Sequence, residues 1–126
     1  MKTGTGYTIT TGEWFGKCVR HYDGNSRLHN DHGPAEVWKD GSYVWYFHGE
    51  KHRSDGPAEY RVTSFTGDEV KEWFFNGKQH RLDGPALIWG DKLQSWWIDG
   101  VCYGKTGHTR GFEEARDKYL AVVEKR

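Results

Sequence analysis

Short apolar stretches rich in aromatic residues recur along the chain, and each runs into a turn glycine. The sequence reads WYFHG, WFFNG and WWIDG up to Gly49, Gly77 and Gly100, with RHYDG, which ends at Gly24, as a weaker first copy. Asn-Gly and Asp-Gly after an apolar run favour a type I′ turn, because both central positions need positive φ. Each stretch therefore predicts a strand that enters a tight hairpin.

A second phrase, Gly-Pro-Ala, occurs three times, each time a few residues after one of the turn glycines Gly24, Gly49 and Gly77. It holds all the prolines of the chain, at Pro34, Pro57 and Pro85. A histidine stands five positions before each proline, and the last two copies share His-Arg-x-Asp-Gly-Pro-Ala; the histidines are His29, His52 and His80. Repeats of this kind indicate an array in which each unit packs against the next.

The Asp-Gly-Pro segment predicts a sharp corner before a new strand, since proline is tolerated at the first residue of a strand. We expect Asp55 and Asp83 to accept hydrogen bonds from nearby backbone amides, and Gly56 and Gly84 to adopt backbone angles closed to other residues. We also expect the corner to be braced by two local pairs, His52 with Asp55 and His80 with Asp83.

The histidines do not predict a metal site or an enzyme. Equivalent positions in successive two-strand repeats lie about 10 Å apart, whereas zinc ligands lie about 2.1 Å from the ion. A His–Asp pair also needs a nucleophile beside it, and the repeat supplies no constant Ser or Cys. We therefore predict no catalytic residues, no cofactor and no metal.

Strand alternation divides the side chains between two faces. Four and two positions before each turn glycine stand residues expected to form the core: Arg20, Trp45, Trp73, Trp96, Tyr22, Phe47, Phe75 and Ile98. Three positions before it stand His21, Tyr46, Phe74 and Trp97, on the opposite face. The strands after Gly-Pro-Ala add Trp38 and Trp89 to that second face. A wet sheet face should be polar, but this one is aromatic.

The chain resembles MORN repeats (membrane occupation and recognition nexus), in which a strand ending in Asn-Gly-Lys is followed by His, Gly and a further apolar strand. It is more similar to a divergent variant with His-Arg-x-Asp-Gly-Pro-Ala, associated with phage, giant-virus and bacterial proteins. The resemblance covers the chain from about Tyr22 to Tyr103. It implies a single-layer antiparallel β-meander that serves as a scaffold, dimerisation surface or ligand platform. In a phage setting, it implies an inhibitor of a host defence factor.

We expect one mainly β domain over residues 1–126, with cap strands in 1–21, MORN-like repeats in 22–104 and a capping α-helix in 109–126. The apolar stripe expected on that helix contains Phe112, Ala115, Tyr119 and Val122 or Val123. The chain has two cysteines, no CxxC pair and no apolar run of membrane-spanning length, which favours reduced thiols and a cytoplasmic location.

Net charge is zero, so binding of nucleic acid by bulk positive charge is disfavoured. Two interpretations of the aromatic face stay open. In the first, the aromatic face is covered by the N-terminal segment, by the helix or by a second subunit of a homodimer. In the second, the aromatic face binds a protein partner. Arg53 and Arg81 either form rim salt bridges or bind an anion.

The leading hypothesis is a non-enzymatic module that binds a protein partner through Tyr46, Phe74, Trp97, Trp38, Trp89, Arg53 and Arg81. The alternative is a platform for a small ligand, nucleotide or nucleic acid, built from arginine and aromatic side chains on one sheet face, with Arg53 and Arg81 beside Trp89.

Overall fold

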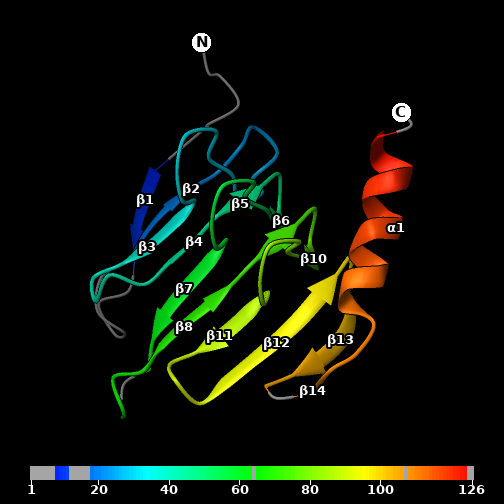
Figure 1. Ribbon diagram of the computed structural model, residues 1–126. Helices are drawn as coiled ribbons and strands as arrows, with labels where there is room; N and C mark the ends of the chain where they lie inside the picture. The colour runs from blue at the N-terminus through cyan, green and yellow to red at the C-terminus, as the bar shows by residue number, and fades with distance from the viewer. Residues whose placement is uncertain (1–7, 12–17, 64, 107, 125–126) are drawn as a thin grey trace.

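The computed structural model describes residues 8–11, 18–63, 65–106 and 108–124, and it confirms a mainly β fold with a C-terminal helix. Ten strands form one open antiparallel sheet in which each strand pairs with its neighbours in chain order (Figure 1). Residues 1–7, 12–17, 125 and 126, which belong to the expected N-terminal cap and to the end of the expected helix, lie outside the described residues.

The main sheet is a meander. Its strands, in spatial order, are β1 (Thr8–Thr11), β2 (Cys18–His21), β3 (Glu36–Trp38), β4 (Tyr43–Val44), β7 (Glu59–Val62), β8 (Glu69–Glu72), β11 (Leu87–Trp89), β12 (Leu93–Ile98), β13 (Val101–Lys105) and β14 (His108–Thr109). The predicted cap strands are the pair β1–β2, and β2 continues directly into the repeats by pairing with β3.

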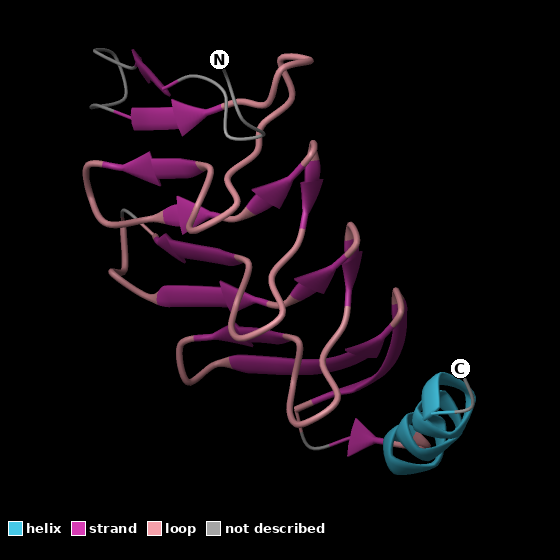
Figure 2. Ribbon diagram, turned by 90° about the horizontal axis from the view of Figure 1, so that it is seen from above, coloured by secondary structure: helices cyan, strands magenta, loops and turns pink. Residues whose placement is uncertain are grey.

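Two short hairpins project from the main sheet at the side of the turn glycines (Figure 2). They are β5 (Tyr46–Phe47) with β6 (Glu50–Lys51), and β9 (Phe74–Phe75) with β10 (Lys78–Gln79). Their turns have positive φ at both central residues, 48° and 88° at His48-Gly49 and 51° and 83° at Asn76-Gly77. Asp99-Gly100 follows the same pattern between β12 and β13. Paired positive φ values define the predicted type I′ turn.

The aromatic stretches before the turn glycines were expected to form continuous strands, but two of them are interrupted by a bend at their tryptophan. Trp45 lies between β4 and β5, and Trp73 lies between β8 and β9. The amide of Trp45 donates to Ala58 in the main sheet at 2.6 Å, while its carbonyl accepts from His52 in its own hairpin at 3.2 Å. Each bending residue therefore bonds in two directions. Trp96 instead stays inside β12, where a register shift between Ser95 and Trp97 absorbs the change.

The core is thin, as a single-layer sheet requires. The alanines of the three Gly-Pro-Ala phrases are fully buried, as are Val44, Val70 and Ile98 to within a few per cent; the alanines are Ala35, Ala58 and Ala86. The expectation that Phe47 and Phe75 join this core is wrong, since they are 46% and 37% exposed. Their hairpins turn away from the main sheet, so their rings pack against histidines along its side.

Helix α1 (Phe112–Glu124) packs at the end of the array beside β12 (Figure 1). Phe112 is buried, and the ring of Tyr119 lies 4.9 Å from that of His80. The apolar stripe continues to Val122 and Val123, which are exposed. The first half of the helix thus covers the last repeat, while its C-terminal turn extends beyond the repeat.

Candidate functional site

The five aromatic residues predicted for the second face are distributed along one side of the array, and we call this set the aromatic face: Trp38, Tyr46, Phe74, Trp89 and Trp97. Sheet registers align Val44 with Glu59, Glu59 with Glu72 and Glu72 with Leu87, which places their side chains on one face. Trp89 follows Leu87 by two residues in β11 and so extends the same face. Tyr46 and Phe74 lie beyond the bends and are related to this face by Lys51, which bonds Glu59, contacts the Phe74 ring and is the strand partner of Tyr46. Trp89 is exposed and the other four rings are half-buried.

Paired charges lie between these rings. Arg20 donates to Glu36 at 2.7 Å and lies over the Trp38 ring at 5.5 Å. The Nε1–H of Trp38 in turn donates to Glu36 at 3.2 Å. The next repeat uses Lys51, whose ammonium group is 2.6 Å from Glu59 and 5.0 Å from the centre of the Phe74 ring.

The network continues across the strands through Arg61, which bridges Glu59 at 2.7 Å and Glu72 at 2.8 Å. Gln79 donates to the other oxygen of Glu72 at 2.8 Å. The three cations Arg20, Lys51 and Arg61 thus match the three carboxylates of Glu36, Glu59 and Glu72. The aromatic face is therefore close to electrically neutral despite its many charged groups.

Protonation equilibria follow from these contacts. Burial opposes the charge of Lys51, but the hydrogen bond and charge of Glu59 outweigh it together with nearby Tyr46 and Glu72, so the pKa of Lys51 is raised. Burial also raises the pKa of the Tyr46 hydroxyl. The hydrogen bond to Glu36 raises the pKa of Arg20. All three residues keep their ordinary charge states at neutral pH.

The two remaining predicted binding residues, Arg53 and Arg81, lie on the opposite side of the sheet. Their guanidinium carbons stand 4.2 Å and 3.9 Å over the rings of Trp45 and Trp73. Arg81 donates to Asp83 at 2.9 Å and to the carbonyl of Pro85 at 3.1 Å, and Arg53 makes the equivalent bonds. Both arginines therefore brace the corners, and neither is brought beside Trp89.

These arginines also explain the corner glycines and aspartates. Neither Gly56 nor Gly84 has positive φ, so the expected special backbone angles are absent there. A Cβ atom at Gly84 would instead lie 2.8 Å from the guanidinium carbon of Arg81. Asp55 and Asp83 bond the arginine two residues earlier, and the hydrogen bonds from Arg53 and Arg81 lower the pKa of both carboxyl groups. Glycine at positions 56 and 84 therefore leaves room for the two guanidinium groups.

The predicted pairs of His52 with Asp55 and of His80 with Asp83 are not formed, because each histidine bonds the next repeat. Nδ1 of His52 accepts from the amide of Asn76 at 2.9 Å, and Nδ1 of His80 accepts from the amide of Asp99 at 3.0 Å. An accepting Nδ1 carries no proton, so the neutral ring is protonated at Nε2. We call the equivalent residues His29, His52 and His80 the histidine column. This column connects each corner to the following type I′ turn.

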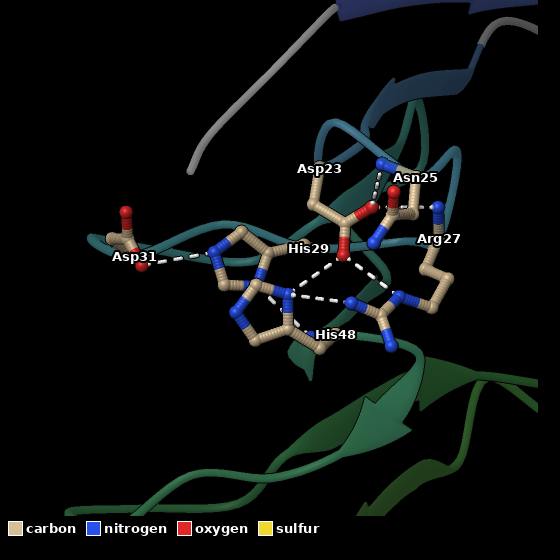
Figure 3. Close-up of polar contacts among 6 residues, drawn as sticks. All are labelled: Asp23, Asn25, Arg27, His29, Asp31 and His48. Carbon is tan, nitrogen blue, oxygen red and sulfur yellow. Dashed lines mark hydrogen bonds and ion pairs between the residues drawn. The ribbon is translucent and has the colours of Figure 1, made fainter. Parts of the chain in front are cut away.

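The first repeat adds a polar cluster that sequence reasoning missed (Figure 3). Asp23 is buried and accepts from His48 Nδ1 at 2.6 Å and from Arg27 Nε at 2.9 Å. The hydrogen bond from His48, with backbone amides of Arg27 and Asn25, holds the pKa of Asp23 well below its usual range. One signal in the sequence was His48 itself, which occupies a turn position taken by Asn76 and Asp99 in later repeats.

His29 connects this cluster to the histidine column. It is fully buried, its ring stacks on His48 at 3.9 Å, and its Nδ1 accepts from the His48 amide at 2.9 Å. Its Nε2 contacts Asp31 at 2.9 Å. These partners are rings, carboxylates and a guanidinium, so the histidines of the cluster face none of the hydroxyl or thiol groups that a Ser–His or Cys–His pair activates. The cluster joins the first repeat to the second.

The histidine column and the cysteines also bear on metal and redox chemistry. Phe47 and Phe75 separate successive histidines of the column, and no group of three or more ligating side chains occurs among the described residues. Cys18 is buried on β2 and Cys102 is exposed on β13, and the six strands of the sheet that lie between β2 and β13 keep the two thiols from bonding each other.

Comparisons with known protein families, with curated proteins and with solved structures find no match for this chain. In the part of the chain that the structure describes, no helix has both the length and the apolar character needed to cross a bilayer. The geometry of the two sides of the sheet is therefore the basis for assigning a function.

Proposed function

We propose that the protein is a non-enzymatic binding module that captures a protein partner through its aromatic face. The observation that carries this proposal is the set of five rings held among charges that cancel. Trp and Tyr are the usual anchors of protein interfaces. Because the charges between the rings cancel, apolar contact is the main source of affinity. A nucleic acid would instead need unpaired positive charge.

The position of α1 supports this proposal. The start of the helix lines a groove with Trp96 and Leu82, and its Tyr119 contacts His80. Trp96 precedes Trp97 in the same strand, so the two side chains point to opposite sides. The helix thus packs on the side of the sheet away from the aromatic face, and the hypothesis that it covers this face loses its basis.

The alternative platform for small ligands or nucleic acid has less support. It required Arg53 and Arg81 beside Trp89, whereas both guanidinium groups are paired with aspartates on the opposite side. The narrower role, a phage-encoded inhibitor that acts on a host defence factor in the host cytoplasm, rests on the resemblance to His-Arg-x-Asp-Gly-Pro-Ala proteins. Self-association through the aromatic face belongs to the same proposal and gives a homodimer.

The experiment combines a mass measurement with affinity capture. The free protein is analysed by sedimentation equilibrium, and then used to capture partners from a host extract at low and at high salt. The triple variant Tyr46→Ser, Phe74→Ser, Trp97→Ser should lose whichever association the native protein shows, while native association should persist at high salt. The matched control is Val122→Ser with Val123→Ser, which removes exposed apolar side chains from α1.

The outcomes separate the possibilities. Association that survives the triple substitution, with the far-UV circular dichroism spectrum unchanged, would remove the aromatic face from the proposal. Association that disappears at high salt in the native protein would point to charge contacts instead. Loss of association in the α1 control, but not in the triple variant, would move the interface to the helix.

A further inference from the structure

The hairpin between β9 and β10 carries the one Asn-Gly pair of the sequence at its tip, Asn76-Gly77. Both residues are exposed, and in the part of the chain that the structure describes no hydrogen bond holds the side-chain amide of Asn76. Asparagine is thermolabile, because the nitrogen of the following peptide bond can attack its side-chain carbonyl carbon. Glycine hinders this attack least, since it has no Cβ atom. The pair therefore has the composition and the exposure of a site of spontaneous covalent modification.

The reaction at this pair needs water as its only co-reactant. The backbone nitrogen of Gly77 forms a bond to Cγ of Asn76 and loses its proton, and the side-chain NH2 group leaves as ammonia. The five-membered cyclic imide that results then takes up one water molecule, which breaks one of its two C–N bonds. Breaking the bond to Cγ leaves aspartate, whereas breaking the bond to the main-chain carbonyl carbon leaves isoaspartate, whose main chain is one methylene longer. Both products carry one more negative charge than asparagine.

The folded turn holds the two reacting atoms apart. Asn76 and Gly77 have φ values of 51° and 83°, as in a type I′ turn, where ψ of the first central residue is about 30°. This ψ directs the Gly77 nitrogen away from Cβ of Asn76, so the ring can close only after the turn has opened. Opening breaks two bonds to the preceding repeat. They run from the Asn76 amide to His52 Nδ1 at 2.9 Å and from the Gly77 amide to the Lys51 carbonyl at 2.8 Å.

The last turn of the array shows which product the repeat accepts. Asp99-Gly100 occupies the equivalent position and has positive φ at both residues. It makes the same two bonds, from the Asp99 amide to His80 and from the Gly100 amide to the Gln79 carbonyl. Aspartate at position 76 therefore fits the turn. Isoaspartate does not, because its longer main chain moves the two amides apart and they can no longer reach both acceptors.

We propose that Asn76 is a modification site whose deamidation is controlled by the bonds between repeats. The reaction proceeds through the open hairpin tip, so its rate depends on how often the β9–β10 turn separates from the preceding repeat. Conversion to isoaspartate prevents the turn from re-forming and disconnects two neighbouring repeats. This site goes beyond the proposed function and does not depend on it, because the chemistry is that of the turn and involves no partner.

The test follows deamidation of the full-length protein at mildly alkaline pH by peptide mapping with mass spectrometry. Asn25 and Asn30, which precede Ser26 and Asp31, are internal controls. In the urea-unfolded protein we expect Asn76 to react faster than both controls. In the folded protein its rate should be at least about tenfold lower, which is the effect of two net hydrogen bonds on the opening equilibrium. Equal rates in the two states would overturn the proposed control, and an unreactive Asn76 in the unfolded chain would remove the site.

Variants identify the bonds that control the reaction. His52→Ala removes one of the two bonds and should accelerate deamidation of the folded protein about fivefold. His80→Ala is the matched control, since it removes the same side chain from the next turn and should leave the rate at Asn76 nearly unchanged. Equal acceleration by the two substitutions would show a general loss of stability and contradict the proposal. Asn76→Asp should keep the thermal midpoint of the native protein, and a large fall would refute the comparison with Asp99.

Discussion

The substitution Gly84→Ala tests whether the corner glycines are required for space. A Cβ atom at this position would lie 2.8 Å from the guanidinium carbon of Arg81 and 3.1 Å from both terminal nitrogens. Gly84 does not have positive φ, so its backbone conformation accepts alanine without strain. The flexible end of the Arg81 side chain must therefore shift, which disturbs its contact with the Trp73 ring at 3.9 Å and its bonds to Asp83 and Pro85.

The cost follows from those three contacts. The cation–π contact contributes about 1 kcal/mol at a partly exposed site, and the hydrogen bond to the Pro85 carbonyl contributes about 1 kcal/mol. The ion pair with Asp83 contributes less, because that carboxylate is largely exposed to water. Alanine recovers about 0.5 kcal/mol by restricting the unfolded chain. Loss of all three contacts gives about 1.5 kcal/mol, and because the displaced atoms are the flexible end of a side chain we expect Gly84→Ala to lower the free energy of unfolding by up to about that value.

Urea denaturation followed by far-UV circular dichroism measures the effect within a double-mutant cycle. In the Arg81→Ala background, Gly84→Ala should instead stabilise the protein by about 0.5 kcal/mol, because the group that it displaces is already gone and only the effect on the unfolded chain remains. Gly33→Ala is the matched control, since its nearest neighbour would be the Asn30 amide nitrogen at 3.7 Å, an ordinary contact. The same cost for Gly84→Ala in both backgrounds would refute the reasoning and show that the backbone itself requires glycine.

Three further predictions concern the histidine column and the two ends of the array. Burial lowers the pKa of His80, so its stabilising bond to the Asp99 amide is intact above pH about 6.5 and is lost as pH falls through the depressed value. Measured from pH about 7.5 down to about 5, the free energy of unfolding should show this loss. His80→Asn keeps an acceptor but does not titrate, so it should remove the pH dependence. Phe112→Ala should cost about 3 kcal/mol in urea denaturation while Val122→Ala costs under about 0.5 kcal/mol, and equal costs would contradict the cap assignment. Asp23→Asn should lower the thermal midpoint at pH 7 but change it little at a pH where the native carboxyl group is protonated. The reason is that a carboxyl group with a lowered pKa stabilises the protein at neutral pH and loses this effect in acid. An unchanged midpoint at pH 7 would show that the cluster is not stabilising.

Local features of the repeat could be predicted because their causes are local. Positive φ at both central turn residues follows from the His-Gly, Asn-Gly and Asp-Gly pairs, and the meander follows from regular strands between such turns. The bends at Trp45 and Trp73 could not be predicted in the same way. They depend on an amide of one repeat bonding the strand of the next, and alternation along a single strand carries no record of that partner.

The interactions of the histidines show the same limit. Short sequence separation suggested that His52 would pair with Asp55, yet the side chain of Arg53 takes that carboxylate and the imidazole turns to Asn76. The residue types at the corner were correctly singled out. The predicted partners of His52 and His80 lie within the same repeat, whereas both histidines accept from the turn of the following repeat. A periodic position occupied by histidine every time is better explained by a periodic neighbour than by a local one.

Bonding between repeats also explains where the chain departs from its own pattern. Every histidine of the column accepts from a turn amide and contacts a ring in the following part of the array, but the strand before the last turn carries Ile98 where the earlier repeats carry Phe47 and Phe75. Asp99 supplies the amide for His80, and Tyr119 of α1 supplies the ring at 4.9 Å that Phe75 supplies to His52 at 4.5 Å. At the other end, the first turn follows the described strands β1 and β2, and its Asp23 binds His48 of the next turn. Departures from the repeat are therefore expected at its ends, where a side chain must replace a missing neighbour.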